Sequence, residues 1–158
     1  MSGEDAGGTG VRGRDGAAGA GSGAPPRAAV RLGMVVLDTP DPRGLAEFYA
    51  RLLGWRVDPQ DTSDDWVSVR GEGGTALGFQ RAEGMPRPTW PEGGVHQQLH
   101  LDLDVDDYDE PEARALALGA TVLDAGRDHL GFRVYADPSG HPFCLCRQVP
   151  PQGGGARG

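Results

Sequence analysis

The fold is decided by a pattern that occurs twice, first as MVVLDTPDPRGLAEFYARLLG at residues 34–54 and again as HLDLDVDDYDEPEARALALG at residues 100–119. Each copy reads as an apolar strand, an Asp-rich turn, a helix and a closing glycine. Met34 aligns with His100 and Asp41 with Asp107, both 66 positions apart. Because self-similarity at a fixed period marks a supersecondary unit used twice, the sequence predicts two equivalent units whose strands can form opposite walls of one cavity.

The first helix is predicted from its start and stop signals. Asp41 suits the N-cap and Pro42 the first helical position, while Gly54 suits a left-handed C-terminal cap. Between them, apolar residues recur at the helical period of 3.6 and form one stripe. The stripe consists of Leu45, Phe48, Tyr49, Leu52 and Leu53.

Three further strands are expected in each unit, so each reads as strand, helix, strand, strand, strand. The first unit has strand candidates at 32–38, 55–58, 66–70 and 75–80. The second has them at 97–105, 120–124, 131–136 and 141–147, with a helix at about 109–118 whose expected apolar stripe is Ala113, Leu116 and Ala117. Gly-rich and Pro-Ser-Gly turns join the last two strands of each unit. The pattern predicts an α+β fold.

The ends of the chain lack this patterning. Nine of the first 23 residues are glycine, and such a segment cannot offset its ordering entropy. We expect residues 1–28 to be a disordered Gly/Ala-rich tail and residues 149–158 a second disordered tail. Residues 82–95 read as a Pro/Gly linker between the units, in which Trp90 is an unusually large apolar residue.

Charge and composition exclude several functions. The net charge is −8, which argues against nucleic acid and anionic membranes as partners. The chain contains no lysine, so Schiff-base chemistry and P-loop phosphate binding are excluded. Its only cysteines, Cys144 and Cys146, are two positions apart on one strand and too distant for an easy disulfide. With no apolar run typical of a signal peptide or membrane span, we expect a cytoplasmic protein.

The strand predicted at 97–105 alternates between two faces. Its odd-numbered positions are apolar and must pack on the helices. Its even-numbered positions are polar, and they face either solvent or a cavity. The polar positions are Gln98, His100, Asp102 and Asp104, continuing from His96.

Two motifs give the chain a family resemblance. The helix LAEFYARLLGW at 45–55 and the turn DPSGHPFCL at 137–145, together with the two βαβββ units, resemble the vicinal oxygen chelate superfamily, and more closely its glyoxalase-like and bleomycin resistance-like members. The resemblance implies a glyoxalase-like domain over residues 29–148, with units at about 32–81 and 96–147. It also implies a curved mixed sheet around a cleft, with the helices on the convex face.

The resemblance places the polar face of strand 97–105 in the cleft. The expected ligand-binding cleft residues are Met34, Trp66, Gln80, Trp90, Gln98, His100, Tyr135 and Cys144. The alternative for Trp66 is a place in the core, and the alternative for Tyr135 is a structural role on its strand. His141 is expected to be a turn or sheet-edge residue, and Asp102 and Asp104 to be solvated. No catalytic residue is assigned.

Metal-dependent members of the superfamily bind one divalent ion, with ligands at the start of the first strand and on the last strand of each unit. The corresponding residues here are Met34, His100, Cys144 and either Phe79 or Gln80, with strand parity favouring Gln80. Thioether sulfur is a poor ligand for Zn²⁺, Fe²⁺ or Mn²⁺. We therefore expect no metal cofactor; if an ion does bind, His100, Gln80 and Cys144 are the expected ligands.

The expected function is metal-independent binding or sequestration of an organic metabolite or antibiotic in an aromatic-lined cleft. The alternative is a divalent-metal-dependent lyase, isomerase or dioxygenase of the same superfamily. Small members of the superfamily often pair, so we also expect a homodimer. A shared fold does not choose between these functions, because folds host many chemistries.

Overall fold

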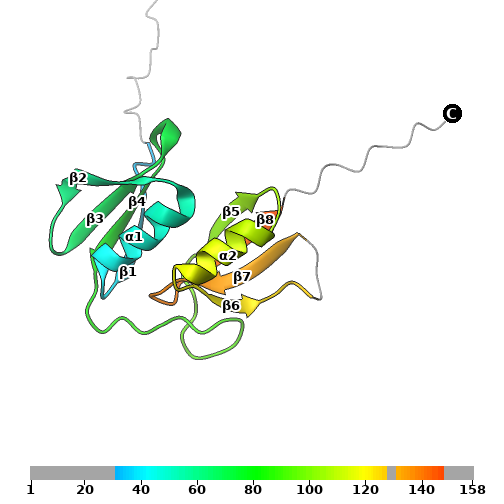
Figure 1. Ribbon diagram of the computed structural model, residues 1–158. Helices are drawn as coiled ribbons and strands as arrows, with labels where there is room; N and C mark the ends of the chain where they lie inside the picture. The colour runs from blue at the N-terminus through cyan, green and yellow to red at the C-terminus, as the bar shows by residue number, and fades with distance from the viewer. Residues whose placement is uncertain (1–30, 128–130, 148–158) are drawn as a thin grey trace, which may run out of the picture. The chain divides into compact units, whose positions relative to one another are not determined.

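The computed structural model describes residues 31–127 and 131–147 and confirms two tandem βαβββ units (Figure 1). The first unit contains β1 (Val35–Thr39), α1 (Pro42–Leu53), β2 (Arg56–Thr62), β3 (Trp66–Arg70) and β4 (Ala76–Arg81). The second contains β5 (Leu101–Val105), α2 (Asp109–Ala117), β6 (Thr121–Asp124), β7 (Phe132–Ala136) and β8 (Pro142–Arg147). The predicted disordered tails, 1–28 and 149–158, lie outside the described residues.

Helix α1 begins and ends where the sequence predicts. The Asp41 side chain accepts a hydrogen bond from the backbone N–H of Gly44 at 3.0 Å, and Pro42 is the first helical residue. Gly54 has a φ of 69° and caps the C-terminus in the left-handed conformation, which glycine adopts without steric cost. In the described ranges, neither this helix nor any other has the length and apolar character needed to span a membrane.

The two units form separate four-stranded sheets with the same topology. The first has the order β1-β4-β3-β2 and the second β5-β8-β7-β6, with β1 parallel to β4 and β5 parallel to β8. The register is also the same, because Val36 pairs with Gly78 and Asp102 pairs with Cys144. Both members of the second pair lie 66 positions after those of the first, so the sequence repeat is a structural repeat.

Aromatic residues from both units share one core. Tyr49 of α1 stacks on Phe79 of β4, with ring centroids 5.6 Å apart. Phe48, on the same helix, meets Phe143 of β8 edge-on at 5.9 Å. In the second sheet, Tyr135 stacks on Phe143 at 5.4 Å. These side chains are buried, and because α1 carries contacts to both sheets, it is the central element of the core.

Two expectations for the second unit are wrong. Strand β5 begins at Leu101, not at residue 97. In α2, the predicted stripe of Ala113, Leu116 and Ala117 is exposed, and Ala115 is the buried residue. Glu112 lies three positions before Ala115 and faces the sheet with it, and its carboxylate accepts hydrogen bonds from the Tyr135 hydroxyl and from Arg133. The side of α2 that faces the sheet is therefore partly polar, and the short apolar stripe points outward.

Candidate functional site

The turn at residues 137–141 (DPSGH) binds the second unit to the first. Asp137 is buried, and its carboxylate accepts hydrogen bonds from the Tyr49 hydroxyl at 2.9 Å and from the backbone N–H groups of Ser139 and His141. The Ser139 hydroxyl also pairs with that of Thr39 at 2.6 Å. Burial raises the pKa of Asp137 and raises that of Tyr49 well above its usual value. The turn therefore joins the two units through buried hydrogen bonds.

A cavity of about 470 Å³ lies where the linker passes strands β1 and β4, and we call it the linker cavity. Most of its wall is apolar, and the polar groups come from strands, linker and turn. Its lining consists of Val36, Leu37, Asp38, Gln80, Met85, Pro86, Pro88, Val95, His96, Gln98, Leu99 and His141. A largely apolar cavity of this size with a few convergent polar groups is typical of small-molecule sites.

Two predicted cleft residues, Gln80 and Gln98, meet in the linker cavity. Each amide both donates and accepts hydrogen bonds, so the pair can orient a polar edge of a ligand against the apolar wall. His141 also lines this cavity, and its Nε2 lies 2.7 Å from the backbone oxygen of Asp38. His141 was expected to be a turn or sheet-edge residue and was not among the predicted cleft residues.

Trp66 lies on the outer face of the first sheet, the face opposite α1. A Cβ built on Gly78 would stand 2.5 Å from the Trp66 ring and 3.0 Å from the sulfur of Met34. The indole N–H donates to the Asp61 carboxylate at 3.1 Å. Trp66 pairs with Gln80 across β3 and β4, so a flat aromatic wall adjoins the linker cavity. The missing side chain at Gly78 is what lets the ring lie there.

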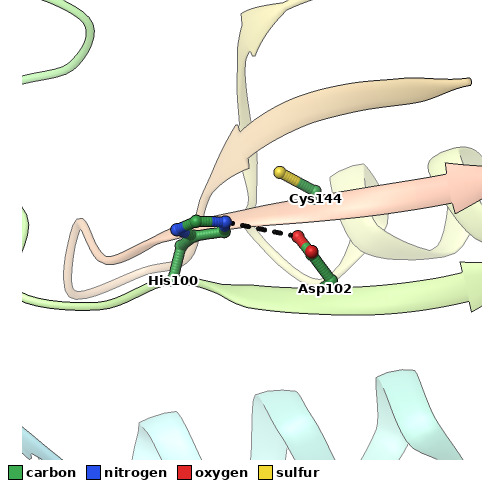
Figure 2. A group of neighbouring side chains, drawn as sticks. All are labelled: His100, Asp102 and Cys144. Atoms are coloured by element: carbon green, nitrogen blue, oxygen red, sulfur yellow. Dashed lines mark ion pairs between the residues drawn. The ribbon is translucent and has the colours of Figure 1, made fainter.

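A second cluster occupies the outer face of the second sheet. Figure 2 shows His100 and Asp102 at β5 and Cys144 on the neighbouring strand β8. The Nε2 of His100 lies 3.4 Å from a carboxylate oxygen of Asp102. One ligand atom from each of the three side chains lies within 4.8 Å of the other two. His100 and Asp102 are exposed, whereas Cys144 is buried.

Both cysteines of this face are free thiols. Burial, with hydrogen bonding and charge repulsion from Asp102, raises the pKa of Cys144 to about 12. Burial and the Asp102 carboxylate also raise the pKa of Cys146. Because the thiolate is the nucleophile, neither residue is activated for nucleophilic catalysis.

A third feature is an apolar crevice of about 550 Å³ at the C-terminal end of α1. Met34, Leu53 and Trp55 contribute to its lining, and Asp102 and Asp104 of β5 add two carboxylates. Met34 is thus placed here and against Gly78, whereas Gln80 and Gln98 line the linker cavity. The predicted cleft residues are therefore distributed over neighbouring sites.

Two other predicted cleft residues lie elsewhere. Tyr135 is fully buried on the helix-facing side of β7, where its hydroxyl donates to Glu112. It is a core residue, because its neighbour in the ladder is Phe143. Trp90 is half-buried in the linker.

The strand register corrects the predicted ligand position in the first unit. Val36 pairs with Gly78, as Asp102 pairs with Cys144, so the counterpart of Cys144 is Gly78 and neither Phe79 nor Gln80. Gln80 faces the outer side, as parity predicted, but it corresponds to Cys146.

Comparison with known proteins agrees with this architecture. A family model described as a glyoxalase-like domain matches residues 34–146, which is most of the described chain. The protein belongs to the glyoxalase-like domain family. A comparison with curated proteins gave no match.

Solved structures of low sequence identity share the fold. A glyoxalase/bleomycin resistance protein/dioxygenase family enzyme from Burkholderia phytofirmans PsJN is 20% identical, with a TM-score of 0.62 over 76% of this chain and 100% of that one. Fosfomycin resistance protein FosX from Mesorhizobium loti is 14% identical, with a TM-score of 0.58 over 77% of this chain and 95% of that one. FosX from Listeria monocytogenes, in complex with Mn(II) and a dihydroxypropylphosphonic acid, is 15% identical, with a TM-score of 0.58 over 75% of this chain and 90% of that one.

The residues present do not fit an ion held between the two units, which is the arrangement that the resemblance implies. The first unit offers Met34, Val36 and Gly78 at the positions of His100, Asp102 and Cys144. Valine and glycine side chains carry no donor atom, and the Met34 sulfur faces Gly78. Among these six positions, good ligand atoms are therefore confined to the second sheet.

Proposed function

We propose that the protein binds a small, flat organic molecule in the linker cavity. The observation that carries this proposal is the meeting of Gln80, from the first unit, with His96 and Gln98, from the segment leading into β5, in one cavity of about 470 Å³. Apolar side chains such as Val36 and Met85 surround these polar groups. An aromatic or heterocyclic ligand with a polar edge matches this lining, because burial of its faces and hydrogen bonds at its edge act together.

We propose that this binding does not require a metal ion. The donors in the cavity wall are amides, imidazoles and Asp38, and His141 is already engaged with the backbone oxygen of Asp38. A protein that sequesters its ligand needs only shape and hydrogen bonding. The free thiols support a reducing, cytoplasmic setting.

We also propose that the protein acts as a homodimer. Large apolar side chains remain exposed on the second unit, among them Leu116, Val122 and Phe132. Val122 lies on β6, which is an edge strand of its sheet. Light scattering at tens of micromolar should give twice the chain mass, and a monomer mass would contradict the proposal.

The binding proposal is tested by NMR titration of ¹⁵N-labelled protein with a panel of flat aromatic amides and carboxylates, including 2-naphthamide and 2-naphthoate. We expect saturable binding that shifts the side-chain amide signals of Gln80 and Gln98. The double variant Gln80→Ala/Gln98→Ala should bind more weakly by about 1–3 kcal/mol through lost hydrogen bonds. Gln60→Ala, on the exposed face of β2, is the matched control.

A panel without any saturable binder would contradict the proposal. So would a binder whose affinity is the same in the wild type and the double variant, because its site would then lie elsewhere.

A further inference from the structure

The apolar crevice of about 550 Å³ at the C-terminal end of α1 has no part in the proposed function. Its walls come from both units, with Leu53 and Leu77 from the first and Leu101 and Leu103 from the second. These leucines belong to the hydrophobic core or pack against it. The crevice therefore lies on the helix-facing side of the strands, whereas the cleft that the family resemblance implies lies on the side away from the helices.

The rim of the crevice is negatively charged. Among the described residues that line it, the charged ones are Asp102 and Asp104, and both are exposed. They lie two positions apart on β5, so their carboxylates project from the same face of the strand. Two like charges beside an apolar cavity repel an anionic ligand and attract a cation.

The C-terminal end of α1 adds a second attraction for a cation. The backbone carbonyl groups of a last helical turn carry partial negative charge. Arg114 of α2 responds to this charge, because its guanidinium donates a hydrogen bond to the backbone oxygen of Leu52 at 2.9 Å. Arg114 is also paired with Glu110 and does not line the crevice. Its positive charge is thus compensated, and the surroundings of the crevice favour a cation.

We propose that the crevice binds an organic cation with a flat apolar body, of the arylalkylamine type. The leucine side chains and Trp55 bury the apolar body. The ammonium group lies at the rim, beside the carboxylates of Asp102 and Asp104. The crevice shares no lining residue with the linker cavity, so this proposal is independent of the proposed function.

The test is a calorimetric titration of the full chain with 2-naphthylmethylammonium and, separately, with its neutral analogue 2-naphthylmethanol. We expect saturable binding of the cation, weakened by added NaCl, and binding of the alcohol that is weaker by about tenfold. The double variant Asp102→Asn/Asp104→Asn should weaken binding of the cation by about three- to tenfold. Asp64→Asn/Asp65→Asn, in the exposed turn between β2 and β3, removes the same charge and should bind as the wild type does.

NMR of the ¹⁵N-labelled protein locates the site. The cation should shift the indole N–H signal of Trp55 and leave the side-chain amide signals of Gln80 and Gln98 in place. All four substituted carboxylates are exposed, and circular dichroism checks that both double variants fold.

Four results would each overturn the proposal. The cation does not bind saturably, or the alcohol binds as tightly as the cation. The control variant weakens binding as much as Asp102→Asn/Asp104→Asn does, or the cation shifts the amides of Gln80 and Gln98 instead of the indole of Trp55.

Discussion

The two units share one backbone pattern and differ in what their sheets carry on the outer face. The compared positions are Met34, Val36 and Gly78 in the first sheet and His100, Asp102 and Cys144 in the second. In the first sheet a thioether lies beside an empty Cβ position, and the Trp66 ring covers it. In the second sheet the same positions hold an imidazole, a carboxylate and a thiol.

The shared backbone places the equivalent side chains close together in both units. The residue types at those positions then decide what each face can bind. The first sheet supplies an aromatic, apolar surface suited to a flat organic molecule. The second supplies ligand atoms suited to an ion. In a scaffold that repeats itself, a few substitutions thus give the two outer faces different chemistry.

The helices offer the largest test of the comparison. Phe48 of α1 is buried against Phe143, whereas Leu116 of α2 is 41% exposed. Phe48→Ala should lower the free energy of unfolding by about 3–5 kcal/mol, because it leaves a cavity in the shared core. Leu116→Ala should cost less than about 1 kcal/mol in the same chemical denaturation. Equal losses of stability would mean that Phe48 and Leu116 are buried to the same extent, which would contradict the described core.

The Asp137 turn is the next test, because it joins the units. Asp137→Ala leaves the Tyr49 hydroxyl and two backbone N–H groups without their acceptor. We expect a loss of about 2–4 kcal/mol in the free energy of unfolding. Asp107→Ala, in an exposed turn of the second unit, is the control and should cost much less. A small effect at Asp137 would show that the units do not depend on this turn.

Gly78 tests the contrast between the two outer faces directly. Gly78→Ala should push the Trp66 ring away from the sheet, shift its fluorescence, and cost about 1–3 kcal/mol through overpacking. Cys144→Ala at the equivalent position of the second sheet removes atoms instead of adding them. It should leave the Trp66 emission unchanged. An unchanged emission in Gly78→Ala would mean that Trp66 does not lie on Gly78.

Thiol reactivity tests the electrostatics of the second face. With the pKa of Cys144 at about 12, the thiolate fraction at pH 8 is small and rises about tenfold per pH unit. Alkylation of the metal-free protein by iodoacetamide should therefore accelerate up to pH 10 without a plateau. Asp102→Asn removes the repelling carboxylate, lowers the pKa and should speed alkylation several-fold at pH 8, measured by mass spectrometry. Asp107→Asn should have no effect, and a plateau near pH 8 would contradict the raised pKa.

The sequence predicts best what local residues determine. The ends of α1 follow from Asp41, Pro42 and Gly54, and each acts on its own turn of backbone. The strands of both units also follow from short-range alternation and turn residues, and the repeat correctly predicts the common topology. These features need no knowledge of distant contacts.

What the sequence does not predict depends on contacts between elements. Helix α2 turns Glu112 toward the sheet, where its carboxylate accepts a hydrogen bond from the Tyr135 hydroxyl 23 positions away, and a three-residue apolar stripe did not reveal this orientation. Asp102 is exposed, as expected, but its place beside Cys144 follows from the pairing of β5 with β8. The same register makes Gly78, not Gln80, the counterpart of Cys144.

One NMR experiment tests the central claim, that a flat organic molecule binds in the linker cavity and not on the outer face of the second sheet. The ¹⁵N-labelled protein is titrated with an aromatic ligand from the panel. We predict that the ligand shifts the signals of Gln80 and Gln98 and leaves those of His100, Asp102 and Cys144 unchanged. If the ligand instead shifts the signals of His100, Asp102 and Cys144, its site lies on the second sheet and the account is contradicted.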